Sequence, residues 1–383
     1  MQYTAMHLVS RSFQLFVKPI GALCNLGCAY CYYLDKQDLY AGNPVRMPEE
    51  LLEKYIIQHL QTFTEEPILF SWHGGEPTLA GLDFYKKAVE LQKRHNTQNK
   101  PIVNGIQTNG VNLDDDWCRF LSSENFLVGI SLDGTQELHD KYRVSKSGEA
   151  TFDRVLDGYD LLRKYHINTE ILCVINASNV NHPLEVYTFF KSLGTKYISF
   201  LPLVNRDLRS ETGVTPDSVP AKAFGDFLIA VFEEWKENDI GRIQIQLFEE
   251  AFRPAFKQEH TLCVFKESCG GVPVLEKNGD FYSCDHFVSK EYLIGNIKQS
   301  HLTDLLDDPR QVAFGMAKLN TLPHYCLQCE VLEMCNGECP KNRFIQTPEG
   351  ENGLNYLCEG YRKFFNHCTP FVNAIADLVG SNE

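Results

Sequence analysis

The sequence predicts an α/β protein, a partial (β/α)6 barrel followed by a small cysteine-rich α+β domain. From residue 12 to 205, apolar β-branched runs alternate with longer amphipathic stretches, which is typical of βα units around a parallel sheet. Beyond Cys263 the chain becomes short hairpin-like pieces with many cysteines. With 383 residues, the chain is long enough for one large domain and a smaller one.

The first half contains an apolar run for each predicted strand. These runs are residues 12–20, 67–73, 101–109, 126–133, 168–177 and 197–204. Helical patterns lie between them, over residues 47–63, 82–95, 114–124, 151–165 and 182–194. In the first of these, Pro48 suits the first helical turn, and Glu49 and Glu50 favour the positive end of the helix dipole. We expect functional residues at the carboxyl ends of the strands, where barrels of this kind bind ligands.

The second half begins with an irregular stretch. Residues 205–222 lack apolar periodicity and carry Gly, Pro and charge, so they predict a linker or surface loop. Residues 223–239 predict a helix. The Asn278-Gly279 pair within residues 272–285 predicts a β-hairpin turn.

The net charge and the cysteine content exclude some classes of function and favour others. The net charge of −14 argues against nucleic acid as a main partner and disfavours anionic membrane surfaces. No stretch approaches the roughly 20 apolar residues of a membrane helix, and the N-terminus lacks an export signal, so we expect a cytoplasmic protein that binds no membrane. Because the cytosol keeps thiols reduced, the 14 cysteines of this chain indicate metal-binding or redox roles.

Three cysteines form a short loop directly after the first predicted strand, with the spacing Cys24-x3-Cys28-x2-Cys31. Three thiolates can hold three irons of a [4Fe-4S] cube and leave the fourth iron open. An open iron can chelate the amino and carboxylate groups of S-adenosylmethionine, which allows reductive cleavage to a 5′-deoxyadenosyl radical. The alternative is a zinc site completed by a histidine, but structural zinc loops prefer C-x2-C pairs and no histidine is nearby.

The segment CNLGCAYCYY resembles the signature loop of radical SAM enzymes. This resemblance implies that Tyr30 contacts the adenine through its backbone. Residues 74–77 resemble the GGEP motif, in which Gly75 lets the backbone approach the methionyl amino group. Ser131 and Arg143 match positions that contact the cofactor's ribose or carboxylate, although each taken singly could be a solvated surface group. Gln107, Thr108 and Asn109 end the third predicted strand on the same rim.

Eight later cysteines suffice for two four-cysteine sites. The C-x2-C-x5-C-x3-C run from Cys326 to Cys339 resembles the SPASM domain, a module that carries auxiliary clusters. The resemblance implies three [4Fe-4S] clusters in all and interlaced ligation. One set is Cys263, Cys269, Cys284 and Cys339, and the other is Cys326, Cys329, Cys335 and Cys358. Spacing alone leaves open a local zinc site made of Cys326, Cys329, Cys335 and Cys339.

The predicted domain boundaries follow from these assignments. Residues 1–205 form the radical SAM partial barrel, 206–260 a linker with helices, and 261–383 a SPASM-type domain with two auxiliary clusters. Three cysteines remain outside the ligand sets. We expect Cys118, Cys173 and Cys368 to be buried structural side chains.

Asp285 is the candidate catalytic residue. It directly follows the predicted ligand Cys284, where a carboxylate beside an anionic cluster is unfavourable unless it is protonated, paired or useful. An elevated proton affinity would suit a general base. The alternative is an exposed acid in a turn.

The combined pattern of CNLGCAYCYY, SWHGGEPTL, GIQTNG, SLDG and CDHF resembles the anaerobic sulfatase-maturating enzymes from about residue 12 to residue 370. This implies oxidation of a Cys or Ser of a sulfatase polypeptide to Cα-formylglycine, with Asp285 taking the thiol or hydroxyl proton and an auxiliary cluster accepting an electron. Tyr33 and His73 would either line the peptide channel or pack in the core. A low-potential donor such as ferredoxin or flavodoxin is the implied redox partner.

Two other functions fit parts of the pattern. An enzyme that crosslinks another ribosomally made peptide would share every cluster motif. A non-catalytic multi-cluster electron carrier would need four ligands at every site, which the loop of three cysteines does not supply.

Overall fold

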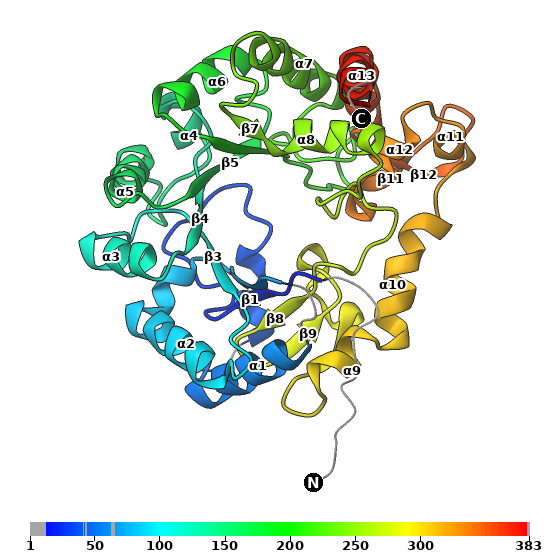
Figure 1. Ribbon diagram of the computed structural model, residues 1–383. Coiled ribbons are helices and arrows are strands. Elements are labelled where there is room, and N and C mark those ends of the chain that lie inside the picture. Colours follow the sequence, from blue (N-terminus) through cyan, green and yellow to red (C-terminus); the bar gives the residue numbers. More distant parts are fainter. Residues whose placement is uncertain (1–12, 41, 43, 63–65, 381–383) are drawn as a thin grey trace. The chain divides into compact units, whose positions relative to one another are not determined.

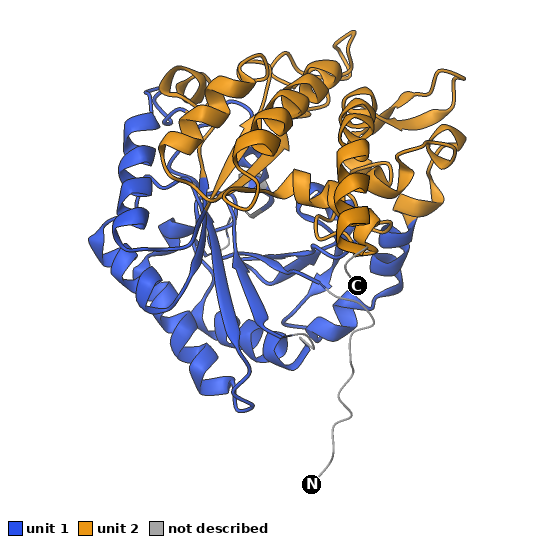
Figure 2. Ribbon diagram, turned by 45° about the horizontal axis from the view of Figure 1, so that its top comes forward, with its two compact units in different colours: residues 1–130, 144–169, 270–316 blue, residues 131–143, 170–269, 317–383 orange. Residues whose placement is uncertain are grey.

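The chain divides into two compact units, each assembled from separate segments (Figure 2). The computed structural model describes residues 13–40, 42, 44–62 and 66–380. Unit 1 comprises residues 1–130, 144–169 and 270–316, and unit 2 comprises residues 131–143, 170–269 and 317–383. The predicted boundaries of the radical SAM barrel, the linker and the SPASM-type domain stay a prediction.

Unit 1 is built on a parallel sheet with the order β1-β2-β3-β4. The strands are β1 (Phe16–Lys18), β2 (Ile68–Trp72), β3 (Ile102–Thr108) and β4 (Leu127–Ser131). The helices that alternate with them are α1 (Glu49–Thr62), α2 (Leu82–His95) and α3 (Asp115–Ser123), and α5 (Phe152–Lys164) follows β4. These strands and helices lie where apolar periodicity predicted them (Figure 1).

The cysteine-rich segment contributes a hairpin to the same sheet. Strand β8 (Val274–Glu276) pairs in parallel with β1, with Phe16 opposite Val274, and pairs antiparallel with β9 (Asp280–Tyr282). Strand β10 (Leu293–Asn296) then pairs antiparallel with β9. The predicted turn is confirmed, because Gly279 adopts a φ of 94°, which favours glycine. Figure 1 shows β8 directly beside β1.

A small apolar core fixes this hairpin under the cysteine loop. Ala22 and Tyr33 pack with Val274, Tyr282 and Val288, and Cys31 lies against the same cluster. The remaining ordered elements that lie mainly in unit 1 are short. They are η1 (Leu34–Tyr40), η2 (Pro77–Ala80), η4 (Asp285–Phe287), η5 (Lys290–Tyr292), α9 (Leu302–Leu306) and α10 (Pro309–Asn320), whose last turn belongs to unit 2.

Unit 2 contains the other predicted strands. They are β5 (Thr169–Ile175) and β6 (Tyr197–Pro202), and β6 also pairs in parallel with the short β7 (Gln244–Ile245). Helices α4 (Gln136–Asp140), α6 (Pro183–Ser192), α7 (Ala221–Asn238) and α8 (Gln246–Phe252) accompany them. The stretch predicted as a loop is irregular up to α7.

The rest of unit 2 carries the C-terminal cysteines. Its elements are η3 (Pro254–Phe256), α11 (His324–Leu327), α12 (Leu332–Cys335), η6 (Pro340–Asn342), the antiparallel hairpin of β11 (Arg343–Gln346) and β12 (Asn352–Asn355), and α13 (Cys358–Gly380). Helices α7 and α13 pack at two glycines, since a Cβ on Gly360 would lie 2.1 Å from the carbonyl oxygen of Ala221. Among the described residues, no helix is long and apolar enough to cross a membrane.

Candidate active site and cluster-binding cysteines

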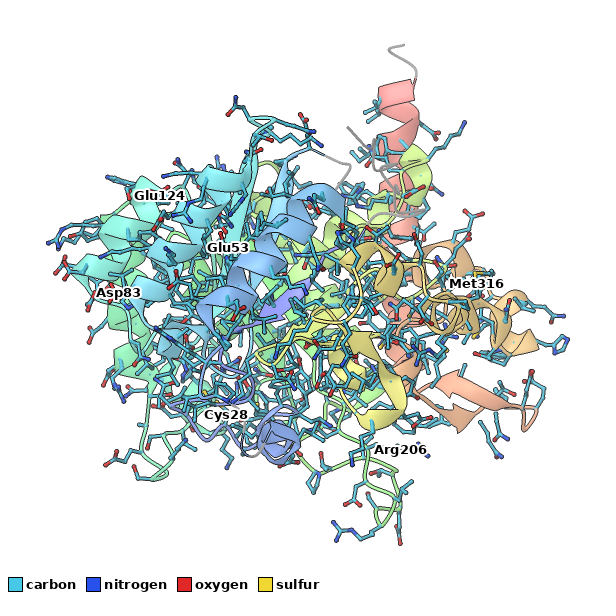
Figure 3. All side chains as sticks on the ribbon, turned by 90° about the horizontal axis from the view of Figure 1, so that it is seen from below. Cys28, Glu53, Asp83, Glu124, Arg206 and Met316 are labelled. Atoms are coloured by element: carbon cyan, nitrogen blue, oxygen red, sulfur yellow. The ribbon has the colours of Figure 1, made fainter. Side chains whose placement is uncertain are left out.

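The loop after β1 brings the first three cysteines together. Figure 3, which labels Cys28, shows it among loops rather than within a helix or strand. The backbone N–H of Cys31 donates to the carbonyl of Cys28 at 3.1 Å, and that of Leu26 donates to Cys24 Sγ at 3.4 Å. Burial raises the pKa of Cys24 to about 11, and charges on Glu76, Cys28 and Cys31 add to the rise. Cys28 and Cys31 therefore act electrostatically on Cys24, and three cysteines on one loop are a donor set that fits an iron-sulfur cluster.

The GGEP loop after β2 is bonded directly to the segment that precedes Cys24. Gly75 N–H donates to the carbonyl of Gly21 at 2.8 Å, and Glu76 N–H donates to that of Leu23 at 2.9 Å. A Cβ on Gly75 would lie 2.3 Å from the carbonyl oxygen of Leu23. Glycine is therefore required here by the chain's own backbone, in addition to the predicted cofactor contact.

Glu76 is buried, and its carboxylate accepts several hydrogen bonds. The sequence placed it in the GGEP motif but did not predict these bonds. Its carboxylate accepts from Thr78 N and Oγ1, from Thr108 Oγ1 at 2.8 Å, and from the backbone of Asn109 at 2.8 Å. Asn109 Nδ2 in turn donates to Asn25 Oδ1 at 2.7 Å, within the cysteine loop. Burial raises the pKa of Glu76, against these hydrogen bonds. The network joins the ends of β2 and β3 to the cysteines.

The other predicted cofactor contacts lie in both units. Tyr30 is buried and belongs to unit 1, as does Gly75. Ser131 and Arg143 belong to unit 2, where Arg143 Nε lies 3.0 Å from Asp133 Oδ2 and both side chains are nearly buried. Arg143 is thus paired with a carboxylate of the chain rather than exposed as a lone surface cation. Their contacts with S-adenosylmethionine stay a prediction.

Asp285 lies where the β8–β9 hairpin meets the end of β1. Lys18 Nζ and the Tyr32 hydroxyl, which belongs to the residue after Cys31, both donate to its carboxylate. The Lys18 side chain is 2% exposed and that of Asp285 is 15% exposed. Lys18 Nζ also lies 3.2 Å from the centre of the Tyr33 ring, and the Tyr33 hydroxyl donates to Glu276.

The expected rise in the proton affinity of Asp285 is wrong for this structure. Burial alone would raise the pKa of Asp285, but the charges of Lys18 and His286 and the hydrogen bonds from Lys18 and Tyr32 hold it well below its ordinary value. The sequence argument lacked Lys18, which lies 267 positions away in the chain. Asp285 is paired with Lys18, whereas burial raises the pKa of Glu276 to about 8.

The two candidates for the peptide channel differ in exposure. Tyr33 is 2% exposed and belongs to the apolar core described above, which favours packing. His73 is partly exposed and stacks on Phe16 with ring centres 3.7 Å apart. Burial lowers the pKa of His73 to about 4, so the ring is neutral at physiological pH.

Four C-terminal cysteines line one pocket in unit 2, and they are the set that resemblance assigned to a single cluster: Cys326, Cys329, Cys335 and Cys358. Cys339, which the local zinc alternative needs in place of Cys358, is not among the lining residues. Burial raises the pKa values of Cys335 and Cys358 to about 12, and the charges of neighbouring cysteines in the pocket contribute. A donor set of four thiols in one pocket fits an iron-sulfur cluster.

The other predicted set is divided between the units. Cys263, Cys269 and Cys339 belong to unit 2, and Cys284 follows β9 in unit 1. Within the described ranges, no group of three or more His, Cys, Asp or Glu side chains has the spacing to hold one metal ion, so both ligand sets stay predictions. Cys118, Cys173 and Cys368 are fully buried, as expected.

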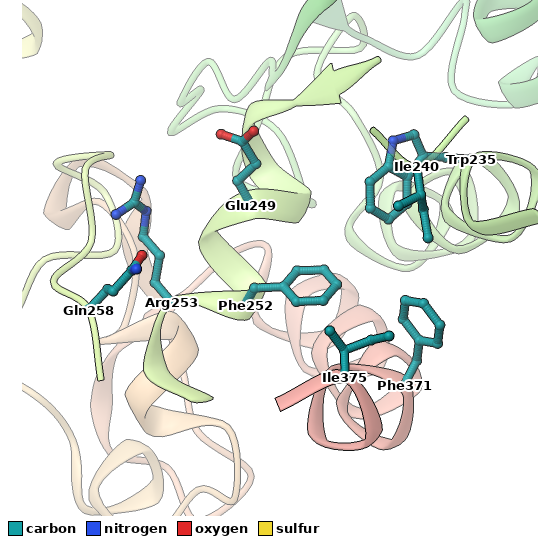
Figure 4. Close-up of a pocket in the computed structure, with 8 residues that line it drawn as sticks. All are labelled: Trp235, Ile240, Glu249, Phe252, Arg253, Gln258, Phe371 and Ile375. Carbon is teal, nitrogen blue, oxygen red and sulfur yellow. The ribbon is translucent and has the colours of Figure 1, made fainter. Parts of the chain in front are cut away.

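A separate pocket of about 430 Å³ lies in unit 2 and has no cysteine in its lining (Figure 4). Its walls are mainly apolar, from Trp235 on α7, Phe252 on α8 and Phe371 on α13, with Glu249 and Arg253 at one side. It contains none of the predicted site residues.

Two family models and several known proteins match this chain. Residues 19–190 match the Radical SAM superfamily, and residues 269–330 match an iron-sulfur cluster-binding domain, SPASM. The serine-type anaerobic sulfatase-maturating enzyme of Bacteroides thetaiotaomicron is 43% identical over 94% of this chain and 90% of its own length. The cysteine-type enzyme of Clostridium perfringens is 32% identical over 95% of this chain and 98% of its own length.

A solved structure extends the likeness to three dimensions. Native anSMEcpe with bound AdoMet and Kp18Cys peptide has a TM-score of 0.85 and 31% identity, covering 95% of this chain and 98% of that chain. The predicted fold class, a partial barrel with a cysteine-rich C-terminal domain, is confirmed. The chain belongs to the anaerobic sulfatase-maturating enzymes, radical SAM enzymes with a SPASM domain that convert a Cys or Ser of a sulfatase to formylglycine.

Proposed function

We propose that Cys24, Cys28 and Cys31 hold a [4Fe-4S] cluster with one open iron, and that Asp285 is the base for oxidation of a sulfatase side chain beside it. When bound, the cluster and S-adenosylmethionine supply an electron and a radical that removes a Cβ hydrogen. The observation that carries the proposal is the bond from Tyr32 to Asp285, because Tyr32 directly follows Cys31. It holds a carboxylate next to the loop of three cysteines.

The surroundings of Asp285 fix its protonation state. Lys18 keeps the carboxylate ionised, which is the form that accepts a proton from a thiol or hydroxyl, and the same pairing lowers its proton affinity. Hydrogen bonds from Lys18 and Tyr32 orient it, so its position does not depend on the substrate. A substrate hydroxyl that approaches Asp285 would replace or share these donors, and of the two Tyr32 is the more exposed, at 39%.

Two further [4Fe-4S] clusters complete the proposal, held by the interlaced cysteine sets. The pocket lined by Cys326, Cys329, Cys335 and Cys358 supports the farther set. One of these clusters would accept the electron that remains after hydrogen abstraction. Tyr30, Gly75, Ser131 and Arg143 would contact S-adenosylmethionine, and a relative of known structure binds AdoMet.

The proposed substrate is a sulfatase polypeptide, since a relative of known structure binds the Kp18Cys peptide. His73, which is partly exposed, is the better of the two channel candidates. A cytoplasmic ferredoxin or flavodoxin would supply electrons.

The test uses reconstituted protein, a strong reductant, S-adenosylmethionine and two sulfatase-motif peptides with Ser or Cys at the target. We expect 5′-deoxyadenosine together with formylglycine, seen as the loss of two hydrogens from Ser, or that loss with sulfur replaced by oxygen from Cys. Asp285→Asn should keep the iron content and lose the peptide product. Cofactor cleavage with neither peptide changed would reject the substrate, and undiminished turnover in Asp285→Asn would reject its role as base.

A further inference from the structure

Two cations inside unit 2 have carbonyl partners in place of carboxylates. Lys318, at the end of α10, is fully buried and donates to the carbonyls of Val264 at 2.7 Å, Cys263 at 3.4 Å, and Lys266. Arg343, at the start of β11, donates to the carbonyls of four residues. These are Gly337 at 2.8 Å, Asn336 at 2.7 Å, Lys318 at 2.6 Å and Glu338 at 3.4 Å. Among the described residues, neither forms a salt bridge.

Both cations lie beside the cysteines of the predicted auxiliary clusters. Gly337 lines the pocket of four cysteines, and its backbone lies against the Arg343 guanidinium so closely that a Cβ there would be 2.4 Å from Nη2. Lys318 binds the carbonyl of Cys263 itself. Charges on Cys326, Cys269 and Cys335 counter the burial that lowers the pKa of Arg343. The pair therefore faces members of both cysteine sets.

The carboxylate of Glu338 acts electrostatically on both cations, but among the described residues it forms no ion pair with either. Glu338 is buried and accepts from the side-chain amides of Asn342 and Asn355. A buried cation without a bonded carboxylate is costly unless another negative charge lies near it. Four thiolates around an iron-sulfur cluster carry a net negative charge, and this charge grows by one electron on reduction.

We propose that Lys318 and Arg343 are the counter-charge of the auxiliary clusters and keep their reduction potentials high enough to accept an electron. The inference rests on the proposed ligand sets. A fixed cation near a cluster favours the reduced state, because that state has one more negative charge. The carbonyl partners leave the positive charge in place, whereas a carboxylate partner would cancel it. The oxidation proposed for this family needs such an acceptor.

The test compares charge with hydrogen bonding. Lys318→Gln removes the charge and keeps amide donors for the carbonyls, and Arg343→Lys keeps the charge but cannot form all four of the guanidinium's hydrogen bonds. Lys363→Gln removes an exposed lysine of α13, the helix that begins at Cys358, and is the matched control. The cluster potentials are measured by redox titration with electron paramagnetic resonance. Cys24, Cys28 and Cys31 are replaced by Ala in the background so that only the auxiliary clusters report.

We expect a shift to lower potential in Lys318→Gln, a smaller one in Arg343→Lys, and none in Lys363→Gln. Unchanged potentials in Lys318→Gln with full iron content would overturn the inference. A background protein that binds no iron would overturn the ligand sets first, which is a different result.

If Lys318→Gln binds too little iron for redox titration, thermal unfolding with and without iron tests the inference instead. Without iron, the counter-charge account predicts that Lys318→Gln is at least as stable as the parent protein, because it removes an uncompensated buried charge. With iron, the parent gains more stability than the variant. An equal loss of stability with and without iron would show that Lys318 only holds the turn at residues 263–266, and would overturn the inference.

Discussion

Replacing Gly75 with alanine tests how the cysteine loop is held. The added methyl would meet three backbone atoms, the carbonyl oxygen of Leu23 at 2.3 Å, its carbon at 2.6 Å, and the carbonyl oxygen of Ala22 at 2.7 Å. None of these can rotate away, so the two loops must separate by roughly 1 Å, a strain that typically costs about 1–3 kcal/mol. The hydrogen bonds from Gly75 and Glu76 would be lost, at about 1 kcal/mol each.

We therefore expect Gly75→Ala to destabilise the protein by roughly 3–5 kcal/mol and to reduce iron binding at Cys24, Cys28 and Cys31. The measurements are thermal unfolding and iron content after anaerobic reconstitution. Gly105→Ala in β3 is the control, because the nearest atom to its added Cβ is 4.0 Å away. If Gly75→Ala binds as much iron as the parent and unfolds at the same temperature, the backbone contact does not position the loop.

Three further changes test other parts of the structure. Lys18→Met leaves Asp285 buried without its cation and should cost about 3–5 kcal/mol in unfolding experiments; the double variant with Asp285→Asn should recover part of this, and strictly additive costs would contradict the pairing. The pKa of Glu276 is raised from 4.5 to about 8, so the folded state holds a proton that the unfolded state releases, and stability should fall as pH rises through that range. Glu276→Gln should flatten this fall between 4.5 and about 8 on the pH scale, and an identical pH dependence of the unfolding temperature in both proteins would refute it. Gly360→Ala would place a methyl 2.1 Å from the carbonyl oxygen of Ala221 and should lower stability by about 1–3 kcal/mol. Gly380→Ala in the same helix, where the added Cβ meets nothing within 4 Å, should leave the unfolding temperature unchanged. Equal effects of these two glycine variants would mean that the close approach of α7 and α13 is not needed.

Local patterns predicted most of the elements that carry the site. The alternation of apolar runs and amphipathic stretches predicted β1 to β6 and the helices between them, because each pattern depends only on residues that are close together in the sequence. The hairpin of β8 and β9 was also predicted, from its Asn278-Gly279 turn. Its parallel pairing with β1 was not, since nothing in either strand specifies a partner more than 250 positions away.

The residues around Asp285 show the same limit. Lys18 at the end of an apolar strand has no signal that sets it apart from a surface lysine, and only the fold brings it to Asp285. Without it, the sign of the pKa shift of Asp285 was predicted wrongly. Glu276 and Lys318 likewise look like solvated charges in the sequence, yet both are fully buried. Motif residues such as Gly75 were predictable because their spacing is local.

The central claim is that the loop of three cysteines holds a cluster to which S-adenosylmethionine binds. The most direct measurement is electron paramagnetic resonance of the reduced, reconstituted protein before and after the cofactor is added, in the parent and in a variant with Cys24, Cys28 and Cys31 changed to Ala. The account predicts that the cofactor alters the spectrum of the parent, and that the variant contains less iron and shows no change. A variant with full iron content, or one whose spectrum still responds to the cofactor, would contradict it.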